Sequence, residues 1–441
     1  MEQAAQVKPK RPRFFYGWVI VAVSSLADAT AFGAGGASFG VFLQPMGESL
    51  GWSRTTLTGA VTLQSVGNLV VSPIIGPILD RYGPRVLMVF GAIVAAIAYM
   101  LMGGVTEPWQ FYVLYTAASA FGLHEVGSMV TTTAVSKWFV RMRGRALAFT
   151  MIGNNLGAIM FAPLAAFLIG AVGWQATWGV LGLLVAATIL PPAILFMRRT
   201  PEDMGLRPDG DPPEPYGQSY STATAQRPRP REEPRWSVRD ALRTRTLWML
   251  VLSFNLASLA VSSMVYHQVA YFQDAGLSLQ AASLVFSLNH LSSMGSKLFW
   301  GFLAERVPVR YCMMGTFLGR TAGFLILLLG TGPERVFFFA LVHGFVGGAI
   351  GNLQAQIWAD YYGRSFLGSI RGILAPFSLV SSIGGPLFAA FMYDQLGSYD
   401  AAFQVFTVTL LLGVTLMYFA RPPGLGKGQP QPSAQPGAVG V

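Results

Sequence analysis

Charge is scarce in this chain of 441 residues. Asp, Glu, Lys and Arg together make up 11 % of it, against about 25 % in a typical soluble protein, whereas hydrophobic residues make up 53 %. A soluble protein of this length needs a charged surface, which so few residues cannot provide. Cysteine is scarcer still: Cys312 is the only one, and this excludes a fold held together by disulfides. The composition therefore indicates a protein that crosses a membrane several times.

Long apolar runs fill most of the sequence, and each is near the ~20 residues that a helix needs to cross the hydrocarbon core. They are continuously apolar rather than alternating, which favours helices over a membrane barrel. The runs lie at 15–43, 55–79, 85–105, 108–138, 144–170, 174–197, 246–272, 279–304, 310–330, 335–359, 366–393 and 401–419. We therefore predict an all-α integral membrane protein with twelve transmembrane helices. Its expected parts are a cytoplasmic N-terminal tail (1–14), a six-helix bundle (15–197), a flexible cytoplasmic linker (198–245), a second six-helix bundle (246–420) and a flexible cytoplasmic tail (421–441).

The charges that are present follow the connections between the runs. The net charge of +10 is spread along the chain and forms no single basic patch, so nucleic-acid binding is not indicated. Most Lys and Arg residues fall on alternate connections, as the positive-inside rule requires of cytoplasmic loops. The remaining connections are mainly acidic and hold Glu48, Glu107, Asp274, Glu334, Asp394 and Asp400. Arg54 and Arg335 are the basic exceptions there. We predict cytoplasmic termini and a plasma membrane location, for example in a bacterial inner membrane.

The two halves of the chain share a repeated motif. After the second apolar run the sequence reads Gly76-Pro-Ile-Leu-Asp80-Arg81-Tyr-Gly-Pro-Arg85, and after the eighth it reads Gly301-Phe-Leu-Ala-Glu305-Arg306-Val-Pro-Val-Arg310. A glycine, an acid and two arginines occupy the same offsets in both. Gly157 and Gly385 form a second, weaker echo. Two pseudo-symmetric halves of six helices are typical of secondary transporters.

The segment Gly76–Arg85 resembles the G-x-L-A-D-R-x-G-x-R signature of the major facilitator superfamily. The resemblance implies that family's fold of two six-helix bundles. An acid at a helix end can pair with arginines of the facing loop, and such pairs hold two bundles together on the cytoplasmic side. Positive-inside anchoring alone explains the arginines but not the acids at matched places. The expected gating residues are Asp80, Arg81, Arg85, Glu305, Arg306 and Arg310.

Four other stretches resemble the branch of that superfamily that contains monocarboxylate transporters and oxalate/formate antiporters. They are Phe15–Ile20, Gly40–Pro45, Lys137–Ala148 and His267–Ala282. In that branch a cation of the eighth helix holds the substrate carboxylate; the matching residue here is Lys297, where the branch commonly has arginine. Lysine keeps the positive charge but lacks the two-pronged geometry of arginine. The branch's second membrane cation has no counterpart here, so the resemblance implies a monocarboxylate rather than a dicarboxylate.

Lys297 is also a candidate from its position alone. It lies about 10 Å from the cytoplasmic end of its predicted helix at 1.5 Å per residue, and a charge at this depth is costly unless it faces the protein interior. His290, Ser293 and Lys297 are spaced three and four residues apart, so they share one helix face. The alternative is a lysine whose stem extends to the membrane surface. The polar face favours a substrate-binding lysine.

Other polar residues inside the apolar runs complete the predicted site. His267 is either the proton-coupling group or a hydrogen-bond donor to the substrate. Asp28 is either a proton carrier, a hydrogen-bond partner of a neighbouring helix or a cation ligand. His124 is expected beside the transport path. Asn154 and Asn352 either contact the substrate or join helices.

The function predicted from these residues is secondary active transport of a small organic anion. A proton-coupled monocarboxylate transporter that works by alternating access fits best; an anion exchanger, an exporter of drugs or other hydrophobic metabolites, and a receptor are the alternatives. An enzyme is not expected, because no nucleophile–base pair or metal-ligand spacing occurs. The expected partners are a small carboxylate, protons and the lipid bilayer. We expect no cofactor, metal or nucleic acid, and a functional monomer.

Overall fold

A computed structural model of the chain describes residues 14–123, 130–139, 142–210, 238–348, 350–362 and 367–423. Helices make up nearly all of these ranges. The first bundle contains α1 (Gly17–Ala31), the π-helix η1 (Phe32–Ala37), α2 (Ser38–Leu50), α3 (Arg54–Tyr82), α4 (Pro84–Met102), α5 (Pro108–Ala118), the π-helix η2 (Ser119–Leu123), α6 (Val130–Trp138) and α7 (Arg143–Phe196). The second contains α9 (Arg245–Asp274), α10 (Leu279–Arg306), α11 (Val309–Leu329), α12 (Arg335–Gly347), α13 (Ile350–Tyr362), α14 (Leu367–Leu396) and α15 (Asp400–Phe419).

The twelve predicted spans correspond to these helices. Eight helices or continuous helix pairs in the described ranges are long and apolar enough to cross a membrane. One of them, α7, covers the fifth and sixth predicted spans, which are separated by a sharp turn at Gly173. Its φ of 81° lies in the left-handed region that glycine adopts without a steric penalty. The first and fourth spans contain short π-helical segments, η1 and η2.

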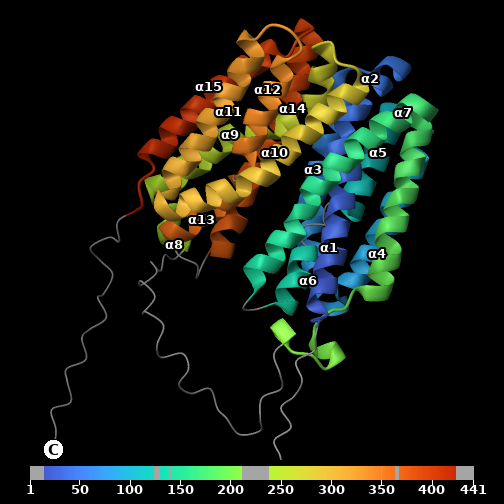
Figure 1. Cartoon of the computed structure of the whole chain (residues 1–441), viewed down its shortest axis with the longest axis vertical. Helices are drawn as coiled ribbons and strands as arrows, with labels where there is room; N and C mark the ends of the chain where they lie inside the picture. The colour runs from blue at the N-terminus through green and yellow to red at the C-terminus, as the bar shows by residue number, and fades with distance from the viewer. Residues whose placement is uncertain are drawn as a thin grey trace, which may run out of the picture.

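The two bundles lie side by side and touch near one end (Figure 1). Helix α7 packs on α10, α3 on α14, and α2 on α9 across the boundary between them. Toward the opposite end, where α6 and α13 lie, the two sets of ribbons diverge. The end at which the bundles diverge is the one where α7 ends and α9 begins, and we call it the linker end. The end at which the bundles touch contains Arg54, and we call it the Arg54 end. On the predicted topology the linker end is cytoplasmic.

Short helices occur at both ends of the predicted linker. Glu202–Met204 and Pro208–Gly210 are 3-10 turns, and Val238–Leu242 is α8. The Asp209 carboxylate accepts a hydrogen bond from the Met142 backbone N–H at 3.1 Å. The first part of the predicted linker therefore packs against the first bundle.

The repeat in the sequence is also a repeat in the packing. Gly157 of α7 lies directly against the backbone carbonyl of Ala29 in α1, and Gly385 of α14 lies in the same way against the carbonyl of Leu259 in α9. In both halves an added Cβ would overlap that oxygen. Small residues at helix crossings allow such close approach inside a membrane. The echo between the two glycines therefore marks equivalent helix crossings.

Replacing Gly157 with alanine is expected to destabilise the protein, because the new methyl group has no room beside the Ala29 carbonyl. Overpacking of this kind costs about 1–3 kcal/mol. Gly179→Ala in the same helix is the matched control, since no heavy atom lies within 4 Å of the added Cβ and helical alanine is favoured over glycine. Thermal unfolding of the two purified variants in detergent measures the difference. A Gly157→Ala variant with an unchanged or higher Tm would contradict the packing.

Candidate functional site

Lys297 lies on the face of α10 that points toward the first bundle. It is seven residues after His290, so the two side chains are about 20° apart around the helix. The His290 ring contacts the ring of Phe32 in η1 of the first bundle, with centroids 5.9 Å apart. The exposed residue Leu291, by contrast, is about 120° away from Lys297. The lysine therefore belongs to the boundary between the bundles and not to the lipid-facing stripe.

The Lys297 ammonium is half-buried and has no hydrogen bond or ion pair to any residue that the structure describes. A second membrane cation, Arg320 of α11, behaves differently. It is 4 % exposed, and its guanidinium contacts the Nε2 atom of His343, whose Nδ1 lies 3.2 Å from the amide nitrogen of Asn289. Arg320 is thus enclosed within the second bundle. Of these two cations, Lys297 is the one positioned to meet a ligand at the boundary.

A cavity of about 480 Å³ lies between the bundles. Its walls come from η1, α3, α9 and α14, so both bundles contribute. Eight of the twelve lining residues carry hydroxyl or amide groups, and none of the twelve is charged. Phe32 lines this cavity and also contacts His290. The cavity and the Lys297 face of α10 therefore meet at the same aromatic ring.

Three other predicted site residues have distinct surroundings. Asp28 is 2 % exposed, and both of its carboxylate oxygens accept from the Thr131 hydroxyl, at 3.0 and 3.2 Å. This bond joins α1 to α6. Asn154 is half-buried on α7, and Asn352 is exposed on α13. No hydrogen bond joins the side chain of either asparagine to another described residue.

Asn155, next to Asn154, has a stronger structural case than its neighbour. It is 8 % exposed, and its amide nitrogen has no acceptor among the described residues. One helical turn later, the carbonyl of Ile159 accepts a hydrogen bond from Ser287 of α10 at 3.0 Å. Asn155 therefore lies on the face of α7 that packs against the second bundle. Asn154 is the candidate substrate contact predicted from the sequence, and the structure places its neighbour Asn155 deeper at the boundary.

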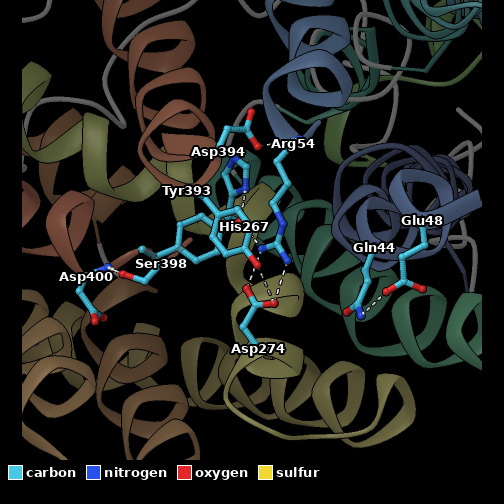
Figure 2. Close-up of polar contacts among 10 residues, drawn as sticks. Gln44, Glu48, Arg54, His267, Asp274, Tyr393, Asp394, Ser398 and Asp400 are labelled. Carbon is cyan, nitrogen blue, oxygen red and sulfur yellow. Dashed lines mark hydrogen bonds and ion pairs between the residues drawn. The ribbon is translucent and has the colours of Figure 1, made fainter. Parts of the chain in front are cut away.

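At the Arg54 end, one arginine of the first bundle contacts four groups of the second. Figure 2 shows Arg54 reaching toward Asp274, Tyr393 and Asp394. Its guanidinium donates to both oxygens of Asp274, at 2.7 and 2.8 Å, and lies 3.7 Å from the centroid of the Tyr393 ring. The backbone N–H of Arg54 donates to Asp394 at 3.1 Å. A two-pronged ion pair of this kind is strong and geometrically specific, so this network fastens the bundles together.

His267 belongs to the same network. Its Nε2 lies 3.0 Å from the Pro386 carbonyl, which can only accept, so Nε2 carries a hydrogen. Its Nδ1 lies 2.9 Å from the Tyr399 hydroxyl, which also accepts from Arg54 at 2.6 Å. Burial raises the pKa of the Tyr399 hydroxyl above its ordinary value, so the hydroxyl stays protonated. It therefore donates a hydrogen bond to Nδ1. The donors thus run in one direction from Arg54 through Tyr399 to His267.

The structure does not bring His267 and Lys297 together. His267 lies seven residues from the end of α9 at Asp274, about 11 Å from the Arg54 end, whereas Lys297 lies about 27 Å from that end along α10. The two residues are therefore about 16 Å apart along the bundles. His267 belongs to the network that joins the bundles at the Arg54 end, whereas Lys297 lies closer to the linker end.

Several predicted residues lie outside the described part of the chain. His124 is one of them, and the side chains of Asp80 and Glu305 are two more. Of the remaining gating residues, Arg81, Arg85 and Arg306 are exposed, and Arg310 donates to the Tyr311 hydroxyl at 2.7 Å. The predicted pairing at the linker end thus remains a prediction.

The Arg54 network was only weakly indicated by the sequence. Arg54 is one of two basic residues on otherwise acidic connections, and Asp274 and Asp394 are among the acids there. Opposite charges on matching connections suggest an ion pair, but several acids share these connections, so the sequence alone does not identify the partner of Arg54. The serines, Gln64 and Asn68 of the cavity had no comparable signal, because isolated small polar residues occur throughout the apolar runs.

Known proteins share this architecture. A model of the Major Facilitator Superfamily matches residues 21–296 and 248–439. The chain is 24 % identical over 413 residues to the oxalate:formate antiporter of Oxalobacter formigenes, covering 93 % of this chain and 92 % of that protein. It is 23 % identical to monocarboxylate transporter 13 of Bos taurus, covering 92 % and 90 %. A solved bacterial homologue of the human lysosomal transporter Spinster, inward-facing and unoccupied, has a TM-score of 0.68 at 13 % identity, covering 93 % of this chain and 98 % of that one. Since the family match spans nearly the whole chain, this multi-pass membrane protein belongs to the major facilitator superfamily of transporters.

Proposed function

We propose that this transporter carries a small monocarboxylate together with a proton. The observation that carries the proposal is the Lys297 ammonium, which lies deep in α10 at the bundle boundary without a described partner. A buried charge without a partner is unfavourable, and a carboxylate bound there removes that cost. The similarity to an oxalate:formate antiporter and to a monocarboxylate transporter supports the same class of substrate.

The proposed cycle uses the two ends of the bundles in turn. With the Arg54 network formed, the bundles are joined at the Arg54 end, and the substrate reaches Lys297 from the linker end. When the network breaks and the linker end closes, the same site opens to the other side. Ligands shift such an equilibrium only through their different affinity for the two states. The acid–arginine motifs around Asp80 and Glu305 are the proposed contacts that close the linker end.

His267 is the proposed proton-coupling group. A proton added at Nδ1 would turn that atom from an acceptor into a donor. The Tyr399 hydroxyl would then lose its acceptor and face two N–H donors, from His267 and from Arg54. Protonation of His267 would also place a second positive charge near the Arg54 guanidinium, and repulsion between the two cations would favour opening of the Arg54 end. Asp28 is a second proposed proton carrier, with Thr131 as its partner.

Uptake into proteoliposomes tests this function. We expect saturable uptake of labelled lactate or pyruvate that rises when the side of entry is made more acidic than the other. Uptake that does not saturate would contradict a carrier. Uptake that exchanges for internal carboxylate but does not respond to a pH gradient would contradict proton coupling and favour an anion exchanger. Failure to move any monocarboxylate would contradict the proposed class of substrate.

The variant His267→Gln is expected to uncouple transport from the pH gradient. Glutamine can still donate to the Pro386 carbonyl, but it cannot take up a proton in the physiological range. We expect gradient-driven accumulation to be lost while exchange of internal for external carboxylate persists. Tyr399→Phe is the companion variant, because it removes the hydroxyl between His267 and Arg54 but leaves the imidazole. Accumulation that survives in His267→Gln would show that the proton is carried elsewhere, with Asp28 the next residue to test.

A further inference from the structure

We propose that the cavity between α3, α9 and α14 binds hydroxyl groups of the substrate. The preferred substrate is then a hydroxylated carboxylate rather than a plain aliphatic acid. This inference deepens the proposed function and rests on it. The cavity volume of about 480 Å³ falls in the range of about 300–1,000 Å³ found for sites that hold drug-sized ligands. Such a volume suits a cargo larger than a three-carbon acid.

The cavity wall presents acceptors. A serine hydroxyl has one hydrogen to donate and two lone pairs. In three lining serines that hydrogen is directed to a backbone carbonyl of the same helix: Ser65 donates to Val61 at 2.9 Å, Ser262 to Ser258 at 2.8 Å, and Ser382 to Leu379 at 3.0 Å. Their lone pairs remain for a ligand. Ligand groups that donate hydrogen bonds therefore fit beside these three serines.

Gln64 gives the same indication independently. Its side chain lines the cavity and is only 7 % exposed, and its Oε1 atom has no donor within hydrogen-bond distance among the described residues. A buried amide oxygen without a donor is unfavourable. A carboxylate cannot satisfy it, because an ionised carboxylate only accepts. One hydroxyl group of a ligand can donate to this amide oxygen, and further hydroxyl groups can donate to the serine lone pairs.

The cavity and Lys297 lie at compatible depths. Counted from the Arg54 end at about 1.5 Å per residue, the α9 wall of the cavity extends from about 12 Å at Tyr266 to about 24 Å at Ser258, so its deep end approaches the level of Lys297, which lies about 27 Å along α10. Phe32 contacts both the cavity and His290, which shares the face of Lys297. We therefore assign the carboxylate of the cargo to Lys297 and its hydroxyl-bearing carbons to the cavity.

A matched pair of six-carbon acids tests the assignment. Gluconate carries five hydroxyl groups and hexanoate none, while both carry one carboxylate. In proteoliposomes, we expect the KM for gluconate to be at least about tenfold lower than that for hexanoate. The variant Gln64→Leu should raise the KM for gluconate about tenfold, in line with the loss of one buried hydrogen bond, and leave hexanoate unchanged. Ser382→Ala should act in the same direction with a smaller change in side-chain volume.

Controls separate this inference from the function on which it rests. Gln280→Leu removes an exposed amide outside the cavity and should change neither KM. If both acids are transported with similar KM and Gln64→Leu affects neither, the hydroxyl assignment is wrong while carboxylate transport stands. If an uncharged polyol such as sorbitol is transported in a Gln64-dependent way and neither acid is, the cavity assignment holds and the carboxylate function fails. Saturable uptake of none of the three overturns both.

Discussion

Replacing Lys297 with alanine is expected to abolish saturable carboxylate uptake. The substitution removes the half-buried cation at the bundle boundary, and the structure describes no other basic side chain on that face of α10 to replace it. Truncating one partner of a buried, hydrogen-bonded charge pair costs about 2–5 kcal/mol. At about 1.4 kcal/mol per factor of ten, kcat/KM for the carboxylate should fall at least about thirtyfold. Initial rates of labelled lactate or gluconate uptake measure the loss.

Two control variants give this result its meaning. Lys297→Arg keeps the charge and should retain a measurable part of the activity, because arginine also binds carboxylates, although with a different geometry. Arg239→Ala removes one positive charge from an exposed position on α8 and should leave uptake unchanged. Full activity in Lys297→Ala would show that the lysine only extends to the membrane surface. The carboxylate would then need another anchor, and the exporter alternative would gain support.

The fold followed from the sequence because its determinants are local. Each transmembrane helix is specified by about twenty consecutive apolar residues, so twelve runs predicted twelve spans. Two helix crossings were also marked in the sequence, because Gly157 and Gly385 occupy equivalent places in the two halves. The turn at Gly173, which interrupts α7, lies between the fifth and sixth predicted spans. None of these features requires knowledge of which helices touch.

The candidate site was harder, because its residues meet only after the bundles pack. Arg54 and Asp274 are 220 residues apart, and Arg54 and Asp394 are 340 apart, so no local pattern joins them. The depth of a side chain, however, was available by counting. His267 lies seven residues from one end of the bundle and Lys297 nine from the other. That arithmetic alone separates the two residues that the resemblance had grouped in one site.

Breaking the Arg54 network is expected to open the Arg54 end. Arg54→Ala removes both bonds to Asp274, the bond to Tyr399 and the contact with the Tyr393 ring. Hydrogen bonds to charged groups contribute about 1.5–3 kcal/mol, and a cation–π contact about 0.5–2 kcal/mol. In the proposed cycle, these contacts join the bundles only while the Arg54 end is closed. Their loss should therefore increase the population open at the Arg54 end by more than about tenfold.

Cysteine labelling measures that population. Cys312 is the only cysteine of the chain, so Cys312→Ala provides a background in which Ser262→Cys places one thiol in the cavity. A membrane-impermeant maleimide added from the Arg54 side should label Arg54→Ala much faster than the parent. Arg335→Ala is the matched control, since its guanidinium donates to the Leu327 and Gly330 carbonyls of its own bundle.

The charge-reversed pair makes the argument specific. Arg54→Asp alone should be labelled as fast as Arg54→Ala or faster, because it places two carboxylates opposite each other. In the double variant Arg54→Asp/Asp274→Arg, the labelling rate should return part of the way to the parental rate, because the ion pair is restored with its charges exchanged. Structural damage from the substitutions would not be reversed in this way. If Arg54→Ala and Arg54→Asp are both labelled at the parental rate, other contacts hold the bundles together. The proposed role of His267 protonation would then lose its physical basis.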